Sequence, residues 1–294
     1  MEGEEMKIIG VIGGMSWTST VDYYRLINKM VKNRLGEPHS AEILMHSVDF
    51  ARIEELQHQG RWQELAERLS GLGKNLSRAG ADILLICANT MHKTAGEVEK
   101  AVDIPLLHIA DCAGEKLKNE GFCKTGLLGT KFTMEQDFYS KRLRERYGIE
   151  VEIPEEDDRD VIHDIIYEEL ISDVFREESQ EVLRGIIADM VKKRDIECAL
   201  LACTELPLLF NAETEAKEES NSDEGENRTG KIFLSLKKFR AFKNTDKNTG
   251  RGEGIPLFDT TYLHADRAVD IALGDDIFAN SSFANSSTEM EKNK

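Results

Sequence analysis

The sequence has no apolar run of about 18 residues or more, so nothing in it predicts a membrane-spanning helix. Its first seven residues, MEGEEMK, are acidic and lead directly into an apolar segment, unlike a secretory signal with its basic start and long apolar middle. Five cysteines are present, but they form no CxxC pair and no cluster typical of a metal site. We therefore expect a cytoplasmic protein with reduced thiols, no metal and no membrane association.

Positively charged residues are also outnumbered by negatively charged ones. The chain carries 38 Lys and Arg against 55 Asp and Glu, a formal net charge of −17. This balance disfavours nucleic acids and anionic membranes as partners. It does not steer an anionic substrate toward the protein either. We therefore expect a carboxylate ligand to be held by local donors inside a cleft.

A dinucleotide-binding fingerprint is missing as well. The turn after the apolar segment 8–12 reads Gly13-Gly14-Met15-Ser16, which does not fit G-x-G-x-x-G. Two glycines followed by Ser and Thr residues predict instead a tight turn and the N-cap of a helix over 21–32. Such a helix N-terminus exposes backbone N–H groups that suit a carboxylate.

The sequence does contain one pattern twice. An apolar segment ends in a glycine turn at 8–20 and again at 124–134, and each is followed by an apolar segment ending in Cys and small polar side chains, at 83–93 (ILLICANTMHK) and 199–209 (ALLACTELPLL). Short apolar runs of this kind are typical of buried parallel strands. The repeat predicts an α/β fold of two pseudo-symmetric α/β domains, whose mostly parallel sheets face an interdomain cleft.

The predicted elements set the domain boundaries. Residues 1–110 with 255–275 form the first predicted domain, and 111–210 form the second. Residues 211–254 are a polar insertion, and 276–294 are a polar tail. Their composition cannot offset the entropy lost on ordering, so we expect both to be disordered. Further strands are predicted at 42–49, 105–109, 125–128 and 198–201, and helices at 61–79, 110–119, 160–175 and 180–194.

Longer motifs resemble one known family. They are GGMSWTSTVDYYRLIN, HSVDF, NTMHK, LLHIAD, LLGTKFTMEQDFY, IYEEL, CTELPLL and PLFDTTYLHADRAV, and the match covers about residues 6–210 and 255–274. Through them the chain resembles the aspartate/glutamate racemases, and within these the broad-specificity amino-acid racemase branch. The resemblance implies an isomerase that needs no cofactor, binds a small-molecule amino acid and forms a homodimer. It inverts Cα by removing a proton on one face and delivering another on the opposite face.

The resemblance also implies which residues do this. One acid/base precedes the Asn-Thr pair of the first unit, and the other is the Cys of the C-T-E motif, which is Cys203. Ala88 occupies the position before the Asn-Thr pair, and Cys87 lies one residue earlier. The predicted catalytic residues are thus Cys203 and Cys87, with the Cys203 pKa lowered toward neutrality at a helix N-terminus. The predicted substrate-binding residues are Met15, Gln57, Ala88, Asn89, Thr90, Thr130, Thr133, Thr204 and Glu205.

Alternatives stay open at this point. Strand alternation would point Cys87 away from the face that Ala88 occupies, so Cys87 is either catalytic through a local twist or a core residue. A lone Cys203 would also suit a single-thiol carbanion enzyme, of the decarboxylase or maleate-isomerase type. A degenerate member that only binds an amino acid is the non-enzymatic alternative.

Overall fold

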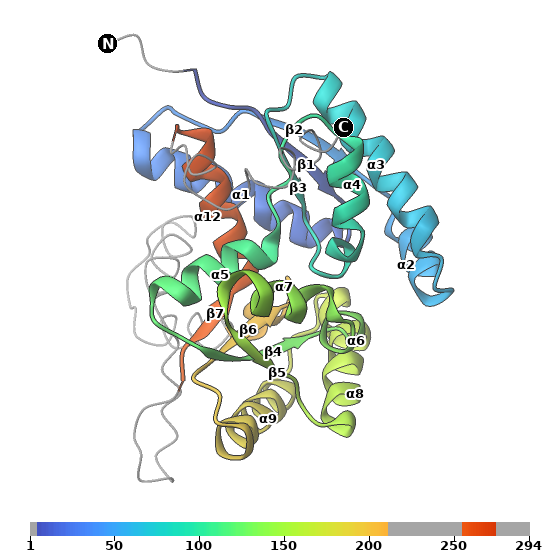
Figure 1. Cartoon of the computed structure of the whole chain (residues 1–294), viewed down its shortest axis with the longest axis vertical. Helices are drawn as coiled ribbons and strands as arrows, with labels where there is room; N and C mark the ends of the chain where they lie inside the picture. Colours follow the sequence, from blue (N-terminus) through green and yellow to red (C-terminus); the bar gives the residue numbers. More distant parts are fainter. Residues whose placement is uncertain (1–4, 211–254, 275–294) are drawn as a thin grey trace, which may run out of the picture.

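The structure, a computed structural model, describes residues 5–210 and 255–274. Two parallel sheets with helices around them form two bodies (Figure 1). The first sheet has the order β2-β1-β3 and the second the order β5-β4-β6-β7. This confirms the predicted α/β class with two domains. The predicted insertion and tail, 211–254 and 276–294, lie outside the described residues.

The strand order repeats between the two sheets. In the first, β1 (Ile9–Gly13) lies between β2 (Ile43–Ser47) and β3 (Ile83–Ile86). In the second, β4 (Lys124–Gly129) lies between β5 (Glu150–Glu152) and β6 (Cys198–Ala202). β7 (Leu257–Asp259) then adds beside β6, and in the first sheet a bridge from Leu84 to Leu106 takes the same place beside β3. The duplication seen in the sequence is therefore a duplication of topology.

The helices follow in chain order. The first unit carries α1 (Trp17–Leu35), α2 (Phe50–His58), α3 (Trp62–Arg78), the 3₁₀ turn η1 (Thr90–Thr94) and α4 (Ala95–Ala101). The second carries α6 (Lys131–Glu135), α7 (Asp137–Tyr147), α8 (Glu156–Asp164), the π turn η2 (Ile165–Glu169), the 3₁₀ turn η3 (Leu170–Ser172) and α9 (Glu177–Arg194). Two more, α5 (Ile109–Asn119) and α12 (Thr260–Ala272), join the two units.

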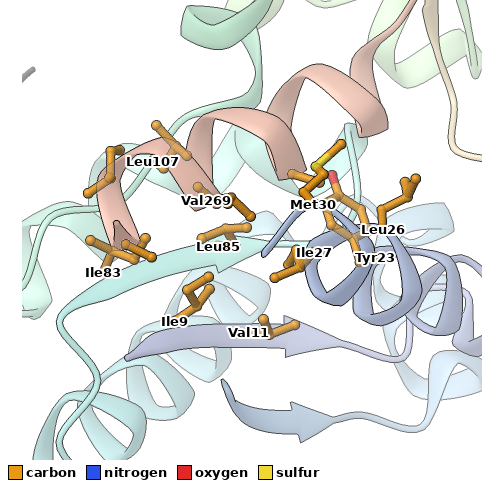
Figure 2. Packing of buried hydrophobic residues seen from close by; sticks show 14 of the residues in the cluster. Ile9, Val11, Tyr23, Leu26, Ile27, Met30, Ile83, Leu85, Leu107 and Val269 are labelled. Atoms are coloured by element: carbon orange, nitrogen blue, oxygen red, sulfur yellow. The ribbon is translucent and has the colours of Figure 1, made fainter. Parts of the chain in front are cut away.

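The first sheet is covered on both faces. Ile9, Val11, Ile83 and Leu85 pack against α1 and α12 (Figure 2). The alternate residues of the same strands, among them Ile12 and Leu84, pack in a second cluster with α3 and α4. Because successive side chains of a strand point to opposite faces, both faces must be apolar, which explains the unbroken apolar runs in the sequence.

The last helix of each unit packs in the core of the other unit. α5 follows the strand-like segment beside β3, yet its Ile109, Ala113 and Leu117 lie in the core of the second sheet. α12 follows β7 of the second sheet, yet its Ala268 and Val269 lie in the core of the first. Figure 1 shows α12 rising from β7 toward α1. The exchange ties the two units together on the side of the molecule that these two helices occupy.

Several predicted elements are corrected by the structure. The predicted first domain includes 255–275, but β7 belongs to the second sheet, and only α12 packs on the first. The predicted strand 105–109 is a single bridge followed by a helix from Ile109. The predicted helix 160–175 starts earlier, and its later part is a π turn and a 3₁₀ turn. The short β5 was not predicted, because a three-residue edge strand carries little apolar signal.

Candidate active site

A pocket lies where the carboxyl ends of the parallel strands of both units meet, the usual place for a ligand in open α/β sheets. The first unit lines it from three segments: the turn after β1, helix α2 and the turn after β3. The second unit lines it from four: the turn after β4, η2, η3 and the turn after β6. The lining residues are Met15, Ser16, Phe50, Gln57, Ala88, Asn89, Thr90, Thr130, Ile166, Tyr167, Ile171, Ala202, Cys203, Thr204 and Glu205.

The turn after β1 depends on Gly14. Gly14 has a φ of 89°, in the region that favours glycine, and a side chain there would meet the backbone of Val48 at 2.3 Å. Its N–H donates to the Thr20 hydroxyl at 2.8 Å. This closes the turn against the first turns of α1, which Ser16 caps by accepting from the Ser19 N–H. The turn therefore presents Met15 and Ser16 to the pocket.

Glu205 is the central hydrogen-bond acceptor of the site. Its Oε1 accepts hydrogen bonds from the hydroxyls of Ser16 at 2.8 Å and Ser19 at 2.5 Å. Its Oε2 lies 2.6 Å from the Thr204 hydroxyl and 3.1 Å from the Cys203 thiol, which both donate to it. Two of these donors come from the first unit and two from the second. One buried carboxylate thus links the units and accepts a hydrogen bond from the candidate catalytic thiol.

The Cys203 thiol is held in its protonated form. Burial raises the pKa of Cys203 well above its ordinary value, and the negative charge of Glu205 raises it further. The backbone N–H groups of Glu205 and Leu206 pull the pKa down, but their effect is smaller. The expected lowering of the Cys203 pKa is therefore wrong, because burial beside a carboxylate outweighs the helix N-terminus.

Three threonine hydroxyls close the pocket between the units. Thr90 follows β3, and Thr130 and Thr133 lie at the start of α6. The Thr90 Oγ1 lies 3.0 Å from that of Thr130 and 3.2 Å from that of Thr133, and the last two are 3.3 Å apart. Thr90 and Thr130 line the pocket, whereas Thr133 is fully buried behind them. Rotating hydroxyls of this kind can donate to a carboxylate without a fixed charge.

Asn89 and Gln57 are buried at the pocket wall. The Asn89 Nδ2 donates to the Thr260 hydroxyl at 3.2 Å, and that hydroxyl donates to the Leu201 carbonyl at 3.0 Å. Asn89 therefore joins the turn after β3 to the first residue of α12. Gln57 Nε2 donates to the Met91 sulfur at 3.0 Å, which leaves its amide oxygen and its second N–H for a ligand.

The profile of the Asp/Glu/Hydantoin racemase family matches residues 12–218, which is more than half of the chain. The chain belongs to this family. A solved structure of a suspected Asp/Glu racemase from Yersinia pestis is 41% identical, covers 91% of this chain and 100% of its own, and has a TM-score of 0.72. An aspartate racemase homologue from Pyrococcus horikoshii is 28% identical, with 91% and 99% covered and a TM-score of 0.68.

More distant relatives share the fold. The glutamate racemase from Francisella tularensis, solved with D-glutamate, is 15% identical to this chain, with 93% and 81% covered and a TM-score of 0.56. At that identity the likeness shows the two-domain architecture and nothing about the ligand of this chain.

In this member of a racemase family, the two walls of the pocket differ in the thiols that they present. Ala88 lines it, but Cys87 does not. Cys87 is fully buried in the cluster of Ile9 and Leu85, on the opposite face of the strand from Ala88, as the strand period requires. Burial also raises the Cys87 pKa far above its ordinary value. The structure thus brings every predicted site residue to the pocket or its wall except Cys87.

Three buried imidazoles support the first wall of this racemase-family site. His92 Nε2 accepts from the Ile109 N–H at 3.2 Å, so its Nδ1 carries the proton and donates to the Ala88 carbonyl at 2.9 Å. His264 donates from Nε2 to the Leu107 carbonyl, and its Nδ1 accepts from the Tyr23 hydroxyl, both at 2.9 Å. Burial lowers the pKa of His92 to about 4 and that of His264 to about 3. Both imidazoles are therefore neutral and act through their hydrogen bonds.

The third, His108, caps α5 by accepting from the Ala110 N–H at 3.1 Å, and its ring lies 4.6 Å from that of His92.

The residues in the described part of the chain form no cluster of three or more His, Cys, Asp or Glu that could hold a metal. None of the helices in that part is both long and apolar enough to cross a membrane.

Sequence reasoning missed several residues of the site. Ser16 and Ser19 were read only as turn and cap residues, and their bonds to Glu205 span more than 180 positions in the chain. Phe50, Ile166, Tyr167 and Ile171 line the pocket from helical segments whose apolar residues are typical of any core face. Only the assembled units show that these side chains face a cavity.

Proposed function

We propose that this protein is an amino-acid racemase that needs no cofactor and uses Cys203 as the acid/base on one face of Cα. The observation that carries the proposal is the thiol of Cys203, hydrogen-bonded to Glu205 at 3.1 Å on the wall of a pocket between the two units. Membership of a racemase family supports it.

The geometry suggests how the proton moves. The substrate carboxylate is held by the hydroxyls of Thr90 and Thr130, which line the pocket from the turns after β3 and β4. Cys203 passes its own proton to Glu205 as it takes the proton from Cα, so no free thiolate has to persist in the buried site. The negative charge that develops on the substrate carboxylate is stabilised by the same donors. Return of the proton along this route regenerates the starting enantiomer.

Inversion needs a proton from the opposite wall. That wall carries Ala88, Asn89 and Thr90, none of which titrates near neutral pH. A water molecule or the Thr90 hydroxyl is then the donor, and the proton that Glu205 took up returns through solvent to neutralise the hydroxide or alkoxide left behind. Inversion is therefore slower than exchange. General acid–base groups contribute about 10²–10⁴-fold, so racemisation is slow but measurable.

The same asymmetry favours a second candidate function. Among the described lining residues, those with ionisable side chains are Cys203, Glu205 and Tyr167, and all three belong to the second unit. A carbanion enzyme that protonates one face only, such as a decarboxylase, needs no more than this.

Incubation of single enantiomers in D₂O separates the two. Proton NMR reports loss of the Cα proton, and chiral chromatography reports inversion. The racemase proposal predicts both, with exchange faster for one enantiomer. Exchange or decarboxylation with no trace of inversion would favour the one-sided enzyme, and binding without any exchange would favour a binding protein.

The homodimer stays a prediction, which a monomeric mass by sedimentation at micromolar concentration would contradict.

A further inference from the structure

The chemistry of the pocket lining restricts the side chain of the substrate. Apart from Gln57 on α2, the polar groups of the lining gather on the turns after the strands, where hydroxyls from both units meet. The rest of the lining is apolar and comes from the helical segments, with Phe50 in the first unit and Ile166, Tyr167 and Ile171 in the second. An amino acid whose carboxylate and amino group occupy the polar turns therefore places its side chain against this apolar wall.

The described lining residues bring no cation to that wall. Among the described residues that line the pocket there is no Lys, Arg or His. Tyr167 adds no charge, because burial raises the pKa of its phenol. His58 and His163 contact the Tyr167 ring, with ring centres 5.8 and 4.5 Å away, but neither lines the pocket. Of the basic groups on the neighbouring segments, Arg25 pairs with Asp22 and Lys131 pairs with Asp160.

The charge already in the pocket is negative. Glu205 lines it, and its field is strong enough to contribute to the raised pKa of Asp22. A second carboxylate on the substrate side chain would be buried without a partner and would be repelled by Glu205. Binding of such a substrate should be weaker by about 10²-fold or more than binding of an uncharged analogue.

Space is limited too. The cavity volume is about 50 Å³. One water needs roughly 10–15 Å³ by this measure, so the cavity holds about three to five waters. That is room for an amino acid with a short side chain. The charge argues against aspartate and glutamate, and the size argues against long side chains. Resting on the proposed function, we propose that the substrate is a small α-amino acid with an uncharged side chain, of the alanine or serine class, and not aspartate or glutamate.

The test compares substrates on the same protein. Cα deuterium exchange is measured by proton NMR for both enantiomers of alanine, serine, aspartate and glutamate, as kcat/KM. We expect alanine or serine to exceed both acidic amino acids by about 10²-fold. Equal or faster exchange of aspartate would overturn the inference while leaving the proposed function in place.

Two variants make the comparison sharper. Ile171→Lys places a cation on the apolar wall and should raise the aspartate-to-alanine ratio by at least about tenfold. Val174→Lys adds the same charge at a residue that is 38% exposed and outside the pocket, and should leave the ratio and the basal rate unchanged. An equal shift in both variants would mean that surface charge sets the preference, which contradicts the inference.

If no amino acid exchanges its Cα proton, the proposed function fails, and binding then decides the inference separately. Isothermal titration of wild-type protein with alanine, serine, aspartate and glutamate reads the same preference without chemistry. Binding of alanine or serine with no binding of aspartate supports a site for neutral side chains. Binding of aspartate as tight as that of alanine, or no binding of any of the four, would overturn it.

Discussion

Replacing Glu205 by Gln removes the negative charge from the pocket while nearly keeping its shape. The carboxylate accepts from Ser16 and Ser19 at one oxygen and from Thr204 and Cys203 at the other. An amide can accept at only one of these positions, so two buried donors face an NH₂ group. Each buried donor left unpaired costs about 1–3 kcal/mol. We expect the free energy of unfolding to fall by roughly 2–6 kcal/mol, measured by urea denaturation.

The same change should move two properties of Cys203 in opposite directions. Burial and the charge of Glu205 together raise the Cys203 pKa, and the variant removes the second cause. Its pKa should therefore fall, and alkylation of the thiol by iodoacetamide at pH 8 should become faster. Cα exchange should become slower by about 10²–10⁴-fold, because the acceptor for the thiol proton is lost. Peptide mass spectrometry distinguishes Cys203 from the exposed Cys123.

Ser19→Ala is the matched control. It removes one donor to the same carboxylate and leaves the charge in place. Alkylation of Cys203 and Cα exchange should change by less than about tenfold. Slower alkylation of Cys203 in Glu205→Gln, or undiminished exchange, would refute the role of Glu205 as the acceptor of the thiol proton.

Three further predictions concern the first wall and its support. Ala88→Cys puts a thiol on the wall that lacks an acid/base group and should raise the ratio of inversion to exchange by at least about tenfold, read by chiral chromatography; an unchanged ratio would count against the asymmetric site. Cys87→Ala should leave the exchange rate within about twofold and lower the free energy of unfolding by about 1–2 kcal/mol, since Cys87 is buried outside the pocket. A loss of exchange as large as that in Cys203→Ala would instead make Cys87 the second catalytic thiol. His264 has a pKa lowered to about 3 from its ordinary 6.5, so between these values the unfolded chain binds a proton that the folded protein does not. Its contribution to stability is present above about pH 6.5 and is lost as the pH falls, at about 1.4 kcal/mol per pH unit. His264→Gln should remove that part of the slope of stability between pH 5 and 7, and identical slopes in urea denaturation would contradict it.

The sequence predicted the duplicated fold because each copy carries its own strand and turn signals. Glycine turns and apolar runs are local features, so β1, β3, β4 and β6 were placed within a residue or two. The sheet that takes β7 could not be predicted, because Leu257–Asp259 has the same apolar pattern whichever sheet it joins. The exchange of α5 and α12 was missed for the same reason, since amphipathic helices do not specify their partner.

The candidate site shows the same division. Asn89, Thr90, Thr204 and Glu205 follow strand ends and were predicted from motifs. Strand alternation correctly placed Cys87 and Ala88 on opposite faces. The Cys203 pKa was predicted in the wrong direction, because it depends on burial and on the Glu205 carboxylate at 3.1 Å, and neither burial nor that distance can be read from the spacing of a motif.

The central claim is that Cys203 moves the Cα proton. The most direct test is Cα deuterium exchange from a single enantiomer of alanine, followed by proton NMR with wild-type protein and with Cys203→Ala. Wild-type protein should exchange one enantiomer faster than it inverts it, and the variant should lose exchange and inversion together, with its fold verified by circular dichroism. Full exchange in folded Cys203→Ala would contradict the account.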